Sequence, residues 1–250
     1  MSKSNKAARS LERVETLLRL GRNQEAGRVA TQLITGDPRN DRAWVLKAQA
    51  LLSEKKYEQA LVAARAASSV AAEAEYPHRL CSIALSHLGR TREAATAAQA
   101  AVELAPDNWA THYLHGQTLL AAQSLPEAQA AAERAVALAP KRPEAHVGLG
   151  AVAAAQQRRD AAENSLRRAL ALDPGNAAAQ LRLDALGSRP RPKGLGGPAP
   201  TTPMAGVAAP ARGAASLARR AGRLRFRLAS LISAAGALIV VALSTGLLGS

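Results

Sequence analysis

The sequence has 250 residues and a net charge of +14, and 48% of its residues are hydrophobic although only 2% are aromatic. This alanine-rich composition argues against a β-sandwich or barrel, whose strands favour β-branched and aromatic residues, and favours closely packed helices. The single cysteine, Cys81, excludes an intrachain disulfide framework and a zinc–thiolate cluster. The high positive charge suggests nucleic-acid binding, and whether it does depends on where the basic residues lie in the sequence.

The N-terminus is predicted to be a short disordered segment, residues 1–6, without a secretory signal. Four charged residues interrupt the apolar side chains between Leu11 and Leu20. A signal peptide needs an unbroken apolar core of about 7–15 residues, which this stretch does not supply. We therefore expect the folded domain to begin at Ala7.

A repeat of 34 residues organises residues 7–187. One position near the end of each unit is proline in four units and alanine in one: Pro38, Ala72, Pro106, Pro140 and Pro174. An alanine stands twelve residues before each of these positions: Ala26, Ala60, Ala94, Ala128 and Ala162. Proline ends a helix and alanine allows two helices to approach closely, so each unit predicts a pair of helices, and neighbouring pairs must stack to bury their apolar faces.

The turn between the two helices of a unit is marked by Gly21 and Gly89 in two of the units. The whole pattern resembles the tetratricopeptide repeat family, whose unit is a helix–turn–helix of the same length. Besides the alanines and prolines, the match is carried by Trp44, Leu17, Leu51, Leu85, Leu119, Ala48, Ser82, Gly116 and Gly150. The resemblance implies an all-α fold, a right-handed α-solenoid of about five units, with residues 177–186 as a helix that closes the last unit against water.

The resemblance also implies a concave face, lined by the first helices, that takes a peptide or helix of a partner protein. On this sequence the face maps to Arg42, Val45, Gln49, Tyr76, Arg79, Ile83, His87, Tyr113, Gln117, Leu120, Glu144 and Val147. Seven of these are predicted to bind the partner: Arg42, Gln49, Tyr76, Arg79, His87, Tyr113 and Gln117. The clamp with which some co-chaperone members hold a terminal carboxylate is not expected, because Ile83 stands at one of its required polar places.

Catalysis, a cofactor and a small-molecule substrate are not expected, because no motif of a catalytic or nucleotide-binding site occurs. Three histidines recur at the repeat spacing: His78, His112 and His146. Equivalent positions in stacked helices are separated by about 8–10 Å, whereas a metal ion needs its ligand atoms within about 2.1 Å of itself. These histidines are therefore predicted to be packing residues and not metal ligands.

The composition changes at Ser188, after which nine basic residues and no acidic residue occur. Residues 188–215 hold six prolines and predict a disordered linker. Residues 216–227 form a basic segment with five arginines: Arg219, Arg220, Arg223, Arg225 and Arg227. Nucleic-acid binding is disfavoured, because the arginines adjoin an apolar segment and only one aromatic residue, Phe226, stands among them.

Residues 228–248 are 21 consecutive residues without a charge. As a helix they would extend about 31 Å, which matches the hydrocarbon core of a bilayer. The sequence therefore predicts a single transmembrane helix, preceded by arginines that attract anionic lipid and keep their own side in the cytoplasm. A buried helix of a soluble domain and a helix lying on the membrane surface are the alternatives.

Two functions remain as hypotheses. In the first, the protein is a membrane-tethered scaffold whose cytoplasmic repeats bind a protein or peptide partner. In the second, it is an assembly or regulatory subunit of a larger membrane complex, whose span packs against other subunits through the small residues Ala229, Ser233 and Ala237.

Overall fold

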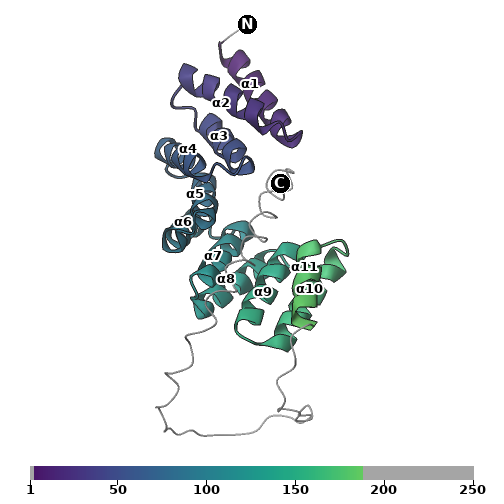
Figure 1. Cartoon of the computed structure of the whole chain (residues 1–250). Helices are drawn as coiled ribbons and strands as arrows, with labels where there is room; N and C mark the ends of the chain where they lie inside the picture. The colour runs from purple at the N-terminus through teal and green to yellow at the C-terminus, as the bar shows by residue number, and fades with distance from the viewer. Residues whose placement is uncertain (1–2, 188–250) are drawn as a thin grey trace, which may run out of the picture.

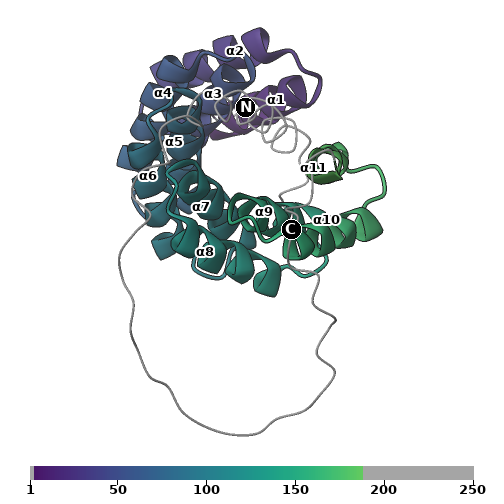
Figure 2. The same cartoon turned by 60° about the horizontal axis from the view of Figure 1, so that its bottom comes forward.

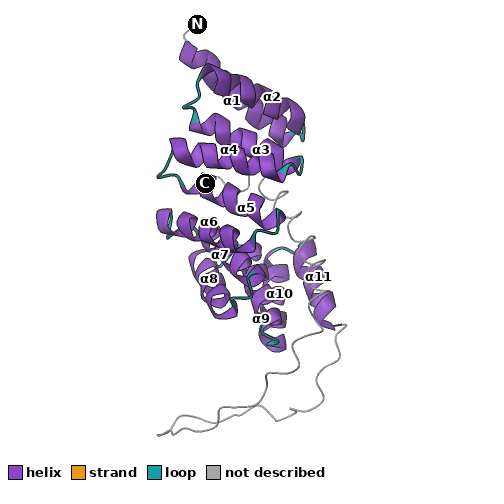
Figure 3. Ribbon diagram, turned by 60° about the vertical axis from the view of Figure 1, so that its left-hand side comes forward, coloured by secondary structure: helices purple, strands orange, loops and turns teal. Residues whose placement is uncertain are grey.

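The structure, a computed structural model, describes residues 3–187, and all regular structure in this range is helical. Figure 3 shows the described part as helices joined by short loops, without strands. The helices are α1 (Lys3–Arg19), α2 (Asn23–Gly36), α3 (Asp41–Ser53), α4 (Tyr57–Val70), α5 (Glu75–His87), α6 (Thr91–Leu104), α7 (Trp109–Ala121), α8 (Leu125–Leu138), α9 (Pro143–Ala155), α10 (Arg159–Leu172) and α11 (Ala177–Gly187).

Five helix pairs, α1–α2 to α9–α10, are stacked in chain order and followed by α11 (Figure 1). Each odd-numbered helix contacts the next odd-numbered helix, whereas the even-numbered helices make no comparable contacts with one another within the described range. The stack therefore curves, with the odd-numbered helices on its inside and the even-numbered ones on its outside (Figure 2). The predicted all-α solenoid of helix pairs is confirmed.

The two helices of a pair approach closely where the sequence repeats its small residues. The hydroxyl of Ser82 donates a hydrogen bond of 2.9 Å to the carbonyl of Ala94 across this contact. A Cβ atom at Gly116 would lie 3.4 Å from the carbonyl oxygen of Ala128, and one at Gly150 would lie 3.3 Å from that of Ala162. The repeated alanines thus face the small residues of the first helix, because backbone meets backbone there and a large side chain has no room.

A residue with positive φ ends the first helix of every pair. Two of the five are the expected glycines, Gly21 and Gly89, and three are not glycine: Lys55, Gln123 and Gln157. Their φ angles lie between 60° and 73°. The next backbone N–H closes the helix end, for example from Ser124 to the carbonyl of Leu119 at 3.0 Å. The hydrogen bonds at the helix end therefore fix the turn in every unit. They do so even in the three units where a residue other than glycine adopts the sterically unfavourable left-handed conformation.

Replacing Gln123 with glycine should raise the free energy of unfolding by up to about 1 kcal/mol. The left-handed conformation costs a residue with a side chain about 1–2 kcal/mol, of which the greater freedom of glycine in the unfolded chain cancels a part. Urea denaturation of both proteins measures the difference. The same change at the exposed helical position Ala130 is the control and should destabilise the protein; a loss of stability at both positions would contradict the argument.

The repeated aromatic rings of the first helices hold the turns between units. The indole Nε1 of Trp44 donates to the carbonyl of Pro38 at 2.9 Å. The Nε2 atoms of His112 and His146 lie 2.8 Å and 2.9 Å from the carbonyls of Pro106 and Pro140. These two histidines therefore have the structural role of binding a carbonyl six residues earlier in the chain.

The core runs through the stack as a series of clusters between neighbouring helices. The largest joins α3 to α7 and contains the buried Leu61 and Leu80. A second cluster joins α9, α10 and α11 around the fully buried Leu166. Each pair is thus stabilised by its neighbours, as in other stacked-repeat proteins.

The helical stack begins earlier than expected at its N-terminal end and ends with α11 as expected. Helix α1 begins at Lys3, so it includes residues 3–6 of the segment expected to be disordered. At the other end, Asp184 of α11 occupies the place of the small residues, where it is exposed and accepts a hydrogen bond of 2.8 Å from Gln180. No second helix among the described residues packs there, so the carboxylate remains in water and α11 closes the stack.

The segments 188–215, 216–227 and 228–248 lie outside the described residues, and so does the predicted transmembrane helix. Between residues 3 and 187, none of the helices has both the length and the apolar character that crossing a membrane requires.

A chain that ends at Ser188 should be soluble, keep the helical signal of the repeats and sediment as a monomer. The clusters described above lie entirely before that residue, and α11 covers the last of them. Circular dichroism and sedimentation of the truncated chain test this, with the full chain in detergent as the reference. Aggregation of the truncated chain would place the domain boundary elsewhere.

Candidate functional site: the inner face of the helical stack

The inner face is the surface that α3, α5, α7 and α9 direct to the inside of the curved stack. At its centre, Tyr76 of α5 receives a hydrogen bond of 2.7 Å from Nε2 of Gln49 on α3. The guanidinium of Arg79 lies over the ring of Tyr76, 5.0 Å from its centroid. Burial raises the pKa of the Tyr76 hydroxyl, and Arg79 and Gln49 oppose that rise only in part. The tyrosine is therefore neutral at physiological pH and is held from two sides.

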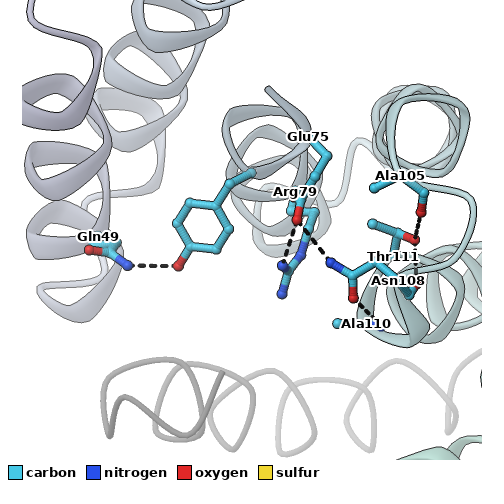
Figure 4. Close-up of polar contacts among 8 residues, drawn as sticks. Gln49, Glu75, Arg79, Ala105, Asn108, Ala110 and Thr111 are labelled. Carbon is cyan, nitrogen blue, oxygen red and sulfur yellow. Dashed lines mark hydrogen bonds and ion pairs between the residues drawn. The ribbon is translucent and has the colours of Figure 1, made fainter. Parts of the chain in front are cut away.

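A second group of polar side chains adjoins Tyr76, and Figure 4 shows its members pointing toward one another. Oε1 of Glu75 lies 3.5 Å from Nη1 of Arg79 and accepts a hydrogen bond of 2.9 Å from Nδ2 of Asn108. The Asn108 side chain also caps α7 by accepting from the amide of Ala110 at 3.0 Å. The residue that caps α7, Asn108, thereby also holds the carboxylate of Glu75 on α5 in place.

Tyr113 of α7 lies further along the inner face. Its ring and that of Trp109 have centroids 6.0 Å apart, and a Cβ atom at Gly148 would lie 3.0 Å from the Tyr113 ring. Burial raises the pKa of Tyr113 to about 12, and the carboxylate of Glu144 acts in the same direction. Gly148 thus leaves the space that this neutral, half-buried tyrosine occupies.

The structure brings together only some of the predicted residues. Gln49, Tyr76 and Arg79 form one connected group, and Tyr113 and Gln117 belong to α7 beside it. Arg42 is exposed on α3 and pairs with Glu15 of α1 through a hydrogen bond of 3.2 Å from Nε.

His87 lies apart from the group around Arg79. It is eight residues further along α5, about 12 Å by the helical rise, and stacks on Tyr57 of α4 with ring centroids 4.3 Å apart. Two other residues that the sequence assigned to this face, Ile83 and Val147, are buried in the hydrophobic clusters. The assignment of these two residues to a binding surface was wrong, because side chains at their turn of the helix reach the neighbouring helices.

Two residues that sequence reasoning missed, Glu75 and Asn108, complete the central group. Asn108 has a local signal, since Asn40 and Asn176 cap the corresponding helices at the same position of their units. Glu75 has only the signal of an acidic residue in the first turn of a helix. Their contact joins residues 33 apart in the sequence, and no local pattern predicts it.

Cys81 should react slowly with a thiol reagent in the folded protein. Its side chain is 6% exposed, and burial raises the pKa of the thiol to about 11 from its ordinary value near 9. At pH 8 the thiolate fraction is about a hundredfold below that of a free cysteine, and the thiolate is the reactive form. Absorbance during labelling with a chromogenic disulfide checks this; a rate that matches the urea-unfolded chain would show that Cys81 is accessible.

Comparison with known proteins agrees with this architecture. A sequence profile described as a tetratricopeptide repeat matches residues 11–76, 83–143 and 113–177, together more than half of the chain. No curated protein matches the sequence.

Among solved structures, TTC0263, a thermophilic repeat protein of Thermus thermophilus, is similar with a TM-score of 0.63 and 19% identity, over 72% of this chain and 98% of that one. YrrB, described as having an unusual peptide-binding site, has a TM-score of 0.55 and 18% identity, over 70% and 90%.

A chain of the APC/C hetero-tetramer Cut9–Hcn1 has a TM-score of 0.65 and 20% identity over 72% of this chain. The match spans about a third of that chain, 36%. Likeness at these identities establishes the fold, and the sequence profile establishes the family. With five helix pairs of the repeat length, small residues at each close contact and a matching profile over most of the stack, this chain belongs to the tetratricopeptide repeat family.

Proposed function

We propose that this protein is a non-enzymatic scaffold, tethered to a membrane, whose inner face binds a protein or peptide partner. The observation that carries the proposal is the connected group of Gln49, Glu75, Tyr76, Arg79 and Asn108 on that face. Tyrosine and arginine are enriched among residues that dominate binding energy, and side chains already held in place lose little entropy when a partner binds. The peptide-binding site named for YrrB and the hetero-tetramer named for Cut9–Hcn1 are consistent with this use of the fold.

The membrane part of the proposal rests on the sequence of residues 216–248. An uncharged segment long enough to span a bilayer follows five arginines, and the excess of arginine favours the cytoplasm for the repeats. Carbonate extraction of membranes should leave the protein in the pellet. Protease added to intact cells should spare the repeats, and the same protease should remove them from inverted vesicles. Release by carbonate would refute the span, and the opposite cleavage pattern would refute the orientation.

Proximity labelling from a fusion at the N-terminus tests the binding function. The double variant Arg42→Glu and Gln117→Lys changes the charge of the inner face at two positions outside the core clusters. It should lose the labelled partner, whereas Arg92→Glu on the outer helix α6 should keep it. If both variants label the same proteins as the wild type, the partner does not bind the inner face.

The second candidate is an assembly or regulatory subunit of a larger membrane complex. The stripe of Ala229, Ser233 and Ala237 favours it, since small residues at this spacing allow membrane helices to pack closely. Native-size measurement in mild detergent distinguishes the two functions: a lone tether migrates as a single chain with its micelle, and a subunit migrates with its complex.

A further inference from the structure

We infer that Glu75 and Arg79 form a docking point for the backbone of an extended peptide. In this arrangement one residue of the partner donates its N–H to Oε2 of Glu75 and accepts a hydrogen bond at its C=O from the Nε–H of Arg79. The inference rests on the proposed partner-binding function of the inner face, and it names the chemical group that this face recognises.

The evidence is that two of the three buried side-chain atoms without a hydrogen-bond partner in the described part of the chain lie together on α5, the third being Oε2 of Glu144 on α9. Oε2 of Glu75 and Nε of Arg79 are both buried, and neither has a hydrogen-bond partner within residues 3–187. Arg79 as a whole is only 6% exposed. Buried polar groups are nearly always hydrogen-bonded, because leaving one unpaired costs much of its hydration energy. One free acceptor and one free donor on successive turns of α5 therefore mark a place where a ligand completes the hydrogen bonding.

The free atoms belong to side chains that the structure holds in position. The other carboxylate oxygen of Glu75 is bound by Asn108 at 2.9 Å and by Arg79 at 3.5 Å. The guanidinium of Arg79 rests over Tyr76, whose hydroxyl is bound by Gln49 (Figure 4). Residues of α3, α5 and the start of α7 thus fix the donor and the acceptor before a ligand arrives, which lowers the entropic cost of binding.

The charges select the class of ligand. A carboxylate or phosphate near Arg79 meets the negative charge of Glu75, and an ammonium group near Glu75 meets the positive charge of Arg79. A neutral group with a donor and an acceptor side by side satisfies both atoms. In an extended chain the N–H and C=O of one residue point to the same side, as they do toward a neighbouring strand, and present this pair.

The experiment uses the full chain in detergent as the target for a phage library of random peptides. Peptides that bind are synthesised, and each backbone N–H in turn is replaced by an ester oxygen, which removes one donor and keeps the side chains. An ester at one position should weaken binding about tenfold or more, the loss expected for a hydrogen bond to a charged group.

Two variants of the protein test whether the sensitive backbone position of the peptide binds Arg79 and Glu75. Arg79→Met, which keeps the side-chain length but removes the donor, should weaken binding by a similar factor, and Arg92→Met on the outer face should leave it unchanged. In Glu75→Gln the amide oxygen takes the place that accepts from Asn108, so the NH₂ group replaces the free acceptor. The ester should therefore cause a large loss with the wild type and a small loss with Glu75→Gln. Melting curves by circular dichroism confirm that each variant is folded, and the near-isosteric Glu75→Gln serves as the test if Arg79→Met unfolds.

The outcomes separate this inference from the function on which it rests. Binders that lose affinity in the Arg42→Glu and Gln117→Lys variant but not in Arg79→Met or Glu75→Gln would overturn the docking point and leave the inner face as the binding surface. Sensitivity to peptide side chains without any sensitive ester position would also overturn it, in favour of a side-chain amide. A library that yields no binder, or binders indifferent to every inner-face variant, would count against both.

Discussion

Replacing Leu166 with alanine should lower the free energy of unfolding by about 2–5 kcal/mol, the largest effect expected for a single substitution in this chain. Leu166 has no exposed surface and belongs to the cluster that joins α9, α10 and α11. Its side chain fills the space beside Gly150, where a Cβ atom would lie 2.8 Å from the Leu166 Cγ. The backbones around it are held by the close contact of the two helices, so the cavity cannot collapse fully.

Urea denaturation followed by circular dichroism measures the loss. Because the stack is stabilised between neighbours, hydrogen exchange should show that protection falls first in α9, α10 and α11. The control is Leu181→Ala, the same chemical change at a residue of α11 that is 54% exposed, and its cost should be well below 1 kcal/mol. Equal costs at the two positions would mean that Leu166 is not part of a packed core.

A further variant tests the cause of the loss. Gly150→Ala should destabilise the wild type, because its new methyl group meets Leu166. In the Leu166→Ala background the same change should cost clearly less, because the methyl group no longer meets Leu166 and only its 3.3 Å approach to the Ala162 carbonyl remains, while alanine favours the helix. Additive effects of the two changes would contradict direct packing between these residues.

Replacing Ala128 with leucine should lower the free energy of unfolding by about 1–3 kcal/mol through overpacking. Ala128 is fully buried on α8, where the helix backbone faces Gly116 of α7. A Cβ atom at Gly116 would already lie 3.4 Å from the Ala128 carbonyl and from the amide of Ala132. The larger side chain therefore has to push α7 and α8 apart, and the contacts of α7 with α9 are disturbed as well.

Thermal and urea denaturation of the variant measure this effect. Ala130→Leu is the matched control, since Ala130 lies on the same helix with its side chain exposed. That control should change the stability by no more than about 0.5 kcal/mol. Unchanged melting of Ala128→Leu would mean that this alanine does not lie at a helix–helix contact.

The sequence by itself determined the architecture of residues 7–187. The positions of the alanines, the small residues and the prolines depend on backbone contacts that recur in every pair, and such contacts restrict each unit in the same way. The spacing of 34 residues therefore predicted five helix pairs and a closing helix, whereas the contacts of His112 and His146 with the carbonyls of Pro106 and Pro140 appeared only in the structure. The sequence marked the turn by glycine in only two units, and the left-handed residues Lys55, Gln123 and Gln157 at the other three turns appeared only in the structure.

Only the tertiary structure decided which side chains of the inner face are buried and which residues they contact. The residues of this face differ from unit to unit, and equivalent positions hold Tyr76, Ala110 and Glu144, so the repeat carries no information about their partners. The packing of each helix against the next decides whether a side chain enters the core, as Ile83 and Val147 do, or meets a residue about one repeat away, as Glu75 meets Asn108. Contacts between side chains of neighbouring units depend on that packing and not on local propensity, which is why the pair of unpartnered atoms on Glu75 and Arg79 became visible only in the folded chain.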